Sequence, residues 1–239
     1  MRIVVTDLTR FQNKELLCLA GLAEDGQQCV RPLLATKPGY LSFDLCKKLN
    51  VLPGTILEGT FTKPQHVDAP HVEDRHFTNL KTVGSVESAE FQSILEKSST
   101  TSIKTGFGCH SKPTDKRFDV LTSPPAKSII TLKLNPKRFQ VVQNKFDNET
   151  IKAHLTDSDG LNLSFLSITD LGFYVNVEQS VTRKISAKEI TEFIQEQDVL
   201  YIRLGLGRKY KNQDGREGYW MQVNGIYTFP NYQKIVRSY

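Results

Sequence analysis

Short runs of apolar and β-branched residues recur along the chain, and residues typical of turns separate them. The runs cover residues 2–8, 16–22, 28–33, 55–61, 128–134, 139–142, 164–170 and 173–177. Runs of this length, bounded by Gly, Pro, Asn or Asp, are typical of the strands of small β-proteins. The pattern therefore predicts a mostly β chain with minor α structure.

Three segments have the spacing of helices instead. Residues 43–49 predict one or two helical turns, and residues 85–97 carry apolar side chains near helical spacing. Ser186 is followed three positions later by Glu189, the pattern of a capping box, which predicts a helix over about 187–196. These helices are short and are interspersed among the predicted strands.

The C-terminal part of the chain has the pattern of a long β-hairpin. Residues 199–206 and 219–229 both read as strands, and residues 207–218 between them are polar. Asp214-Gly215 lies within this polar segment. Because Asp-Gly between two strand patterns is a strong hairpin signal, we expect the two strands to pair.

A boundary between two domains is expected near residue 125. Residues 98–128 are rich in Ser, Thr, Lys and Pro, and Pro124-Pro125 interrupts any regular structure. Val5-Thr6-Asp7-Leu8 is echoed by Ile168-Thr169-Asp170-Leu171, and similar elements follow each segment. We therefore expect two small β-barrels, residues 1–125 with a helical insertion and residues 126–239.

Composition adds a charge asymmetry to this picture. Of 239 residues, 38% are hydrophobic and 24% are charged, as in an ordinary soluble globular protein. The formal net charge is +5, and residues 201–239 hold seven basic and two acidic residues, which accounts for all of it. A basic C-terminal region permits an anionic partner.

Cysteine usage and hydropathy exclude several protein classes. The four cysteines contain no Cys-x-x-Cys pair and are too few for a disulfide scaffold. The first residues read as a strand without the apolar region of a signal peptide, and no apolar run is long enough for a membrane span. We expect a cytoplasmic protein that binds no membrane, and we expect no cofactor. Gly205-Leu206-Gly207 is not a phosphate loop, since the Walker pattern is absent.

The basic hairpin is the leading candidate binding site. Sites for single-stranded nucleic acid combine cations for phosphates with aromatic faces for bases. The candidate cations are Arg203, Arg208, Lys209, Lys211 and Arg216, and the candidate aromatic residues are Tyr210, Tyr219, Trp220 and Tyr227. In the alternative interpretation, Trp220 and Tyr227 are core residues and the charges keep a long loop soluble. Arg31 is a further candidate, which either lies near a ligand or pairs with an acid.

The densest group of titratable residues lies at residues 70–76. His71, Glu73, Asp74 and His76 are weak candidates for a metal site or for acid–base chemistry, to which Cys109 and His110 could add ligands. The alternative is a polar turn in which an acid pairs with Arg75. Asp7 and Asp170 are expected to cap backbone amides at strand ends, and the alternative is that they are matching acids in two sites. No catalytic residue is assigned.

Several motifs, taken in order, resemble those of the prokaryotic dual OB-containing domain family. They are Cys18-Leu-Ala-Gly21, Val30-Arg31-Pro32, residues 70–74, Thr169-Asp170-Leu171-x-Phe173-Tyr174, Leu204-Gly205-Leu206 and Tyr219-Trp220-x-x-Val223-x-Gly225-Ile226-Tyr227. The chain departs from the family at Thr9-Arg10-Phe11-Gln12, where the family usually has a turn rich in Ser and Arg or Lys. The resemblance implies two consecutive OB-like barrels. It also suggests work in nucleic-acid processing or defence, with no agreed activity.

Together these patterns favour a non-enzymatic module that binds nucleic acid. We expect it to take single strands with weak sequence specificity, as one part of a larger prokaryotic nucleic-acid-processing or defence system. One alternative is an adaptor that docks a partner protein through its hairpin and barrel edges. A second alternative is a metal-dependent enzyme that uses the cluster at residues 71–76.

Overall fold

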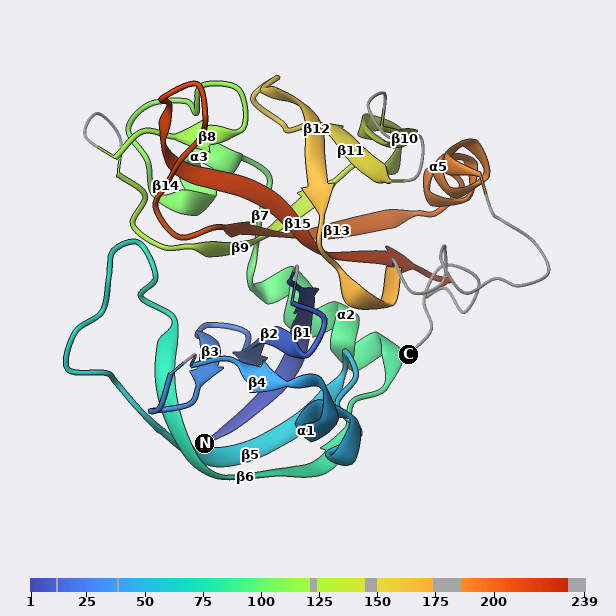
Figure 1. Ribbon diagram of the computed structural model, residues 1–239. Helices are drawn as coiled ribbons and strands as arrows, with labels where there is room; N and C mark the ends of the chain where they lie inside the picture. The colour runs from blue at the N-terminus through green and yellow to red at the C-terminus, as the bar shows by residue number, and fades with distance from the viewer. Residues whose placement is uncertain (12, 38, 121–123, 145–149, 174–185, 232–239) are drawn as a thin grey trace. The chain divides into compact units, whose positions relative to one another are not determined.

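The computed structural model describes residues 1–239 except 12, 38, 121–123, 145–149, 174–185 and 232–239 (Figure 1). The chain divides into two compact units, Met1–Ser98 and Ser99–Tyr239. Most of the predicted strand at 173–177 lies outside the described residues, and Phe173 itself is helical.

The first unit is a small closed barrel. Its elements are β1 (Arg2–Arg10), β2 (Leu16–Ala23), β3 (Cys29–Leu33), β4 (Leu41–Ser42), α1 (Phe43–Lys48), β5 (Thr55–Thr62), β6 (Asp74–Ser85) and α2 (Ser88–Lys97). The sheet order is β1-β5-β6-β3-β2-β4, and β1 also pairs with β2, which closes a ring of five strands. Only β3 and β6 are parallel in this ring. A five-stranded Greek-key barrel of this kind is an OB fold.

The second unit is built on one larger sheet. Its elements are β7 (Ser99–Thr100), α3 (Ile103–Phe107), β8 (Arg117–Phe118), β9 (Ile129–Leu134), η1 (Pro136–Arg138), β10 (Phe139–Gln143), β11 (Ile151–Thr156), β12 (Asn162–Ile168), α5 (Ala187–Gln195), β13 (Val199–Leu206), β14 (Tyr210–Lys211) and β15 (Glu217–Phe229). The sheet order is β10-β11-β12-β15-β13-β9-β7.

The second unit follows the strand order of the first. β9 and β10 are consecutive and joined by the single turn η1, so together they act as one bent strand. This bent strand pairs with β13 through its first half and with β11 through its second half. β12 runs parallel to β15, as β3 runs parallel to β6. The loop between the fourth and fifth strands of this OB-like unit is therefore the basic segment between β13 and β15.

Helix α5 covers the outer edge of β10. The capping box predicted at Ser186 and Glu189 is present and begins this helix. The hydroxyl of Thr191 accepts a hydrogen bond from the Val141 amide at 2.9 Å and lies 3.0 Å from the Val141 carbonyl. An uncovered edge strand invites pairing with other chains, and α5 closes this one.

Two sequence-based expectations differ from the structure. The chain divides at Ser98 rather than near Pro124-Pro125, because β7 pairs with β9 and β8 pairs with β15 of the second unit. Pro-rich composition marked a loop inside that unit. The Thr-Asp-Leu echo also does not mark equivalent positions, since Asp7 lies on the first strand of its barrel and Asp170 follows the third. Strand order, and not these residues, relates the two units.

Other expectations are confirmed. The chain is mostly β with OB-like barrels, and the short helices lie close to the predicted positions. Within the described part of the chain, no helix has both the length and the apolar character needed to span a membrane.

Candidate nucleic-acid interface

The predicted hairpin is present and extends beyond the main sheet. β13 pairs with β15 from Val199 opposite Phe229 to Leu206 opposite Met221. Beyond this point β14 continues the pairing with the start of β15. The turn closes where Gly215, with φ +86°, donates its amide to the carbonyl of Asn212 at 3.1 Å. Glycine adopts this left-handed backbone without steric cost, which explains the Asp-Gly signal.

The cations of the loop are exposed and only partly neutralised. Lys209 pairs with Glu217 at 3.2 Å, and Arg216 pairs with Asp214 at 2.6 Å and with Asp115 at 3.2 Å. The hydrogen bond from Arg216 lowers the pKa of Asp214 to about 2. Lys211 is exposed and makes no ion pair with any described residue. Because exposed pairs contribute at most about 1 kcal/mol, a phosphate can compete for these cations.

The aromatic residues of the hairpin fall into two groups. Tyr210 is 58% exposed, whereas Tyr219 and Tyr227 are buried. Trp220 is half-buried, and the guanidinium carbons of Arg216 and Arg117 lie 5.6 and 5.9 Å from the centre of its ring. Both distances allow cation–π attraction. Tyr210 is therefore the ring best placed to stack on a base.

Three candidates from the sequence are too buried to touch a polymer. Arg203 is 1% exposed and donates to the hydroxyl of Thr131 at 2.7 Å. Tyr219 is 8% exposed and belongs to the core of the second unit. Arg31 is 6% exposed and pairs with Asp74 at 2.5 Å. This agrees with the alternative interpretation, in which Arg31 pairs with an acid. Each of the three lies on a strand, where neighbouring elements bury it. Arg208 is half-buried, which leaves it accessible.

The outer face of β10, β11 and β12 lies within the same unit and was not predicted from the sequence as a candidate binding surface. Ile151, Ala153 and Leu155 are buried, while the intervening Lys152, His154 and Thr156 face outward. The strict alternation of apolar and polar residues along β11 is the sequence signal that could have indicated this face. A hollow of about 200 Å³ opens on the face. OB barrels that bind oligonucleotides use the second and third strands together with the loop between the fourth and fifth.

The segment around Lys116 connects this face to the hairpin. Asp115 pairs with Arg216 of the loop, and the Lys116 carbonyl accepts a hydrogen bond from the Met221 amide on β15 at 2.8 Å. The Lys116 ammonium donates to the Phe165 carbonyl on β12 at 2.9 Å. Burial, and then the charge of nearby Lys152, lower the pKa of Lys116. Cations from three separate parts of the sequence thus gather here.

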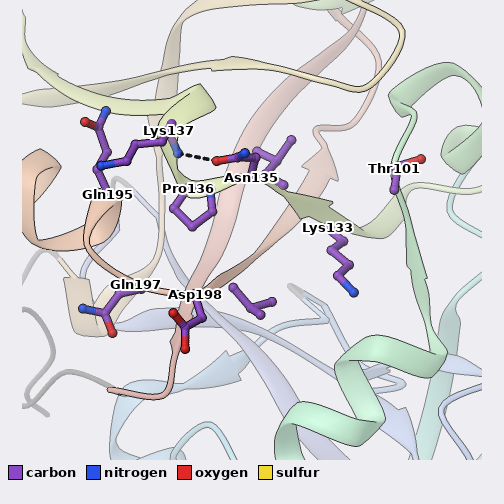
Figure 2. Close-up of a pocket in the computed structure, with 10 residues that line it drawn as sticks. Thr101, Lys133, Asn135, Pro136, Lys137, Gln195, Gln197 and Asp198 are labelled. Atoms are coloured by element: carbon purple, nitrogen blue, oxygen red, sulfur yellow. Dashed lines mark hydrogen bonds between the residues drawn. The ribbon is translucent and has the colours of Figure 1, made fainter.

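A larger hollow of about 430 Å³ lies at the opposite end of β13, beside Asp198 and Val199 (Figure 2). The polar groups of its wall support the fold. The Asn135 carboxamide accepts from the Lys137 amide at 2.9 Å, and the Gln195 carboxamide donates to the Phe139 carbonyl at 3.1 Å. The charges that remain, on lysines and on Asp198, are of mixed sign. This hollow therefore lacks the cation cluster found beside the hairpin.

The cluster at residues 71–76 belongs to the first unit and is mostly buried. His71, Glu73 and Asp74 are each at most 5% exposed, and Asp74 is held by Arg31. His76 lies on β6 and is half-buried. Among the residues that the structure describes, no group of three or more His, Cys, Asp or Glu side chains is arranged to hold a metal ion. The metal-dependent enzyme hypothesis gains no support from this geometry.

Comparison with known proteins agrees with the strand order. The family model described as dual OB-containing domain matches residues 1–226 of the chain. No curated protein and no solved structure matches it.

Proposed function

The chain belongs to the dual OB-containing domain family, and from this premise we propose that it is a non-enzymatic module that binds single-stranded nucleic acid with weak sequence specificity. The binding surface is the loop between β13 and β15 together with the adjoining outer face of β11 and β12. The module serves within a larger nucleic-acid-processing or defence system.

One observation carries this proposal: the basic segment with the exposed Tyr210 is the loop between the fourth and fifth strands of an OB-like barrel. This loop is one of the places where OB barrels contact oligonucleotides. Position in the fold and residue chemistry thus favour the same surface. Neither argument depends on the other, because the strand order comes from backbone pairing alone.

Each side chain has a defined role in the proposed contact. Lys209, Lys211 and Arg216 meet phosphates, with Arg208 at the base of the loop. The Tyr210 ring stacks on a base, which tolerates any sequence because every base has a π-face. Phosphate contacts supply affinity and carry no sequence information. The expected binding is therefore salt-sensitive.

Charge reversal in the loop tests the proposal. Lys209→Glu combined with Lys211→Glu should weaken binding of a fluorescent single-stranded oligonucleotide by at least about tenfold at low salt. The slope of log affinity against log salt should fall by about 0.7 for each phosphate that the variant no longer neutralises. Lys188→Glu is the control, since its side chain is 83% exposed and its helix α5 packs against β10 and η1. Equal affinity of the double variant and the control would reject the loop as the site.

A further inference from the structure

The hollow on the outer face of β10, β11 and β12 is lined almost entirely by polar side chains. They include Gln140, His154, Thr156, Asn162 and Ser164, with Lys137 and Arg138 at one side. Among the described residues, the side chains of Gln140, Asn162 and Ser164 have no hydrogen-bond partner. Each carboxamide offers both donors and an acceptor, and the hydroxyl offers one of each. The groups needed to read the edge of a base are therefore present and uncommitted.

An irregularity in β12 places an aromatic ring beside this hollow. Alternation from the buried Leu163 would turn Phe165 inward, but Ser164 and Phe165 both face outward and Leu166 is buried again. The pairing of β11 with β12 shifts register at this point, and Phe165 has φ +55°. A bulky residue in the left-handed region is strained, and such bulges serve to re-aim a side chain. Strain of this kind is concentrated at functional sites.

The re-aimed ring meets the imidazole of His154. Their ring centres lie 4.6 Å apart, with the planes at 73°. Both residues are half-buried, although Nε2 of the His154 ring is itself buried. An edge-to-face pair of rings therefore adjoins the polar groups of the hollow.

Two ammonium groups lie along the same strand. Lys116 donates to the Phe165 carbonyl at 2.9 Å, and Lys152 donates to the Ser167 hydroxyl at 3.2 Å. Phe165 and Ser167 are two residues apart on β12, a separation of about 7 Å along a strand. The hollow thus has an edge-to-face aromatic pair beside it, hydrogen-bonding groups and two cations, and the segment around Lys116 joins it to the hairpin.

We propose that this hollow is a base-selective subsite, which holds one unstacked base of the strand bound by the hairpin while Lys116 and Lys152 contact the flanking phosphates. The inference rests on the proposed function and adds selectivity to it. Gln140, Asn162 and Ser164 hydrogen-bond the edge of the base, and the Phe165 ring, held edge-to-face by His154, packs against its face. A site with such groups rejects a base that leaves them unpaired.

Binding of homopolymeric single strands of thymine, cytosine and adenine to the full chain tests the subsite. The wild type should prefer one homopolymer by about tenfold at a fixed salt concentration. Gln140→Ala combined with Asn162→Ala should bring the three affinities within about threefold of one another, without changing their salt dependence. Both residues are exposed, so the fold should survive, and Trp220 fluorescence checks this. Gln28→Ala, on an exposed residue of the first unit, is the control.

The outcomes separate the subsite from the wider function. A preference that disappears in the double variant supports the subsite. Two results overturn the subsite and leave the hairpin proposal standing. One is equal, salt-sensitive binding of all three homopolymers by the wild type. The other is a preference that persists in the double variant. No binding of any homopolymer at low salt overturns both.

Discussion

The indole Nε1–H of Trp220 donates a hydrogen bond of 3.3 Å to the backbone carbonyl of Tyr210. The bond joins the half-buried part of β15 to the exposed strand β14, ten residues away in sequence. It fixes the backbone that carries the Tyr210 ring while the ring itself remains 58% exposed. A ring held in place before a ligand arrives loses less conformational freedom on binding.

Replacement of Tyr210 by alanine should therefore cost affinity without costing stability. Stacking on an aromatic side chain contributes about 1–3 kcal/mol per base, so single-stranded oligonucleotides should bind at least about fivefold more weakly. Tyr210→Phe retains the ring and should bind like the wild type. Fluorescence anisotropy measures both affinities. Equal binding by the alanine and phenylalanine variants would show that Tyr210 does not stack on a base.

Much of the fold could be predicted because local signals and tertiary packing agree. The Ser186 capping box and the Asp214-Gly215 turn each depend on a few neighbouring residues, and both appear as expected. The domain boundary depends instead on which distant strands pair. The short β8 reaches across to β15, and no local composition at Pro124-Pro125 reveals that pairing.

The candidate site was predictable where side chains lie in the loop and not where they lie on strands. Lys209, Tyr210, Lys211 and Arg216 are exposed because the loop leaves the sheet. Arg203 and Arg31 have the same chemistry, but each is buried and held by a residue of a neighbouring strand, Thr131 and Asp74. The bulge that exposes Phe165 interrupts the alternation, so period-two reasoning would have placed this ring in the core.

The first unit should be sensitive to the loss of one partner of the buried ion pair between Arg31 and Asp74. Both residues are at most 6% exposed and connect the parallel strands β3 and β6. Asp74→Leu leaves a buried guanidinium without its carboxylate, which should cost about 3–5 kcal/mol of unfolding free energy. Calorimetric unfolding measures the loss.

The double variant Arg31→Met with Asp74→Leu separates charge burial from packing. An apolar pair in place of a buried ion pair is often neutral or stabilising, so this protein should recover most of the loss. Its nucleic-acid affinity should equal that of the wild type, because the proposed site lies in the second unit. A double variant as unstable as Asp74→Leu alone would mean that the ion pair itself supports the fold.

Thr191 should stabilise the second unit through the edge of β10. Thr191→Val keeps the shape but leaves the Val141 amide without its acceptor, which should cost about 1–3 kcal/mol. Thr191→Ser keeps the hydroxyl and should lose much less. Trp220, the one tryptophan of the chain, lies in this unit, so its fluorescence follows denaturant unfolding there. Equal stability of the valine and serine variants would contradict the role of the hydroxyl.

The thiol of Cys46 should remain protonated and unreactive in the folded protein. Burial raises its pKa from 9.0 to about 11, and its side chain is 3% exposed. A folded-state pKa above the unfolded value favours folding below pH 9, and this contribution is lost as the pH rises toward 11. Labelling with a thiol reagent at pH 8, followed by peptide mass analysis, should find Cys46 modified only after unfolding. Labelling as fast as in the unfolded chain would contradict its burial.

The central claim is that the second barrel holds single-stranded nucleic acid through the loop between β13 and β15. The most direct measurement is a titration of fluorescent single-stranded DNA and RNA with the full chain, at low salt and again near physiological salt. Binding should be micromolar or tighter and should weaken as salt rises, because phosphate contacts release counterions. Absence of binding to every oligonucleotide at low salt would contradict the claim and would make an adaptor that docks a partner protein the leading alternative.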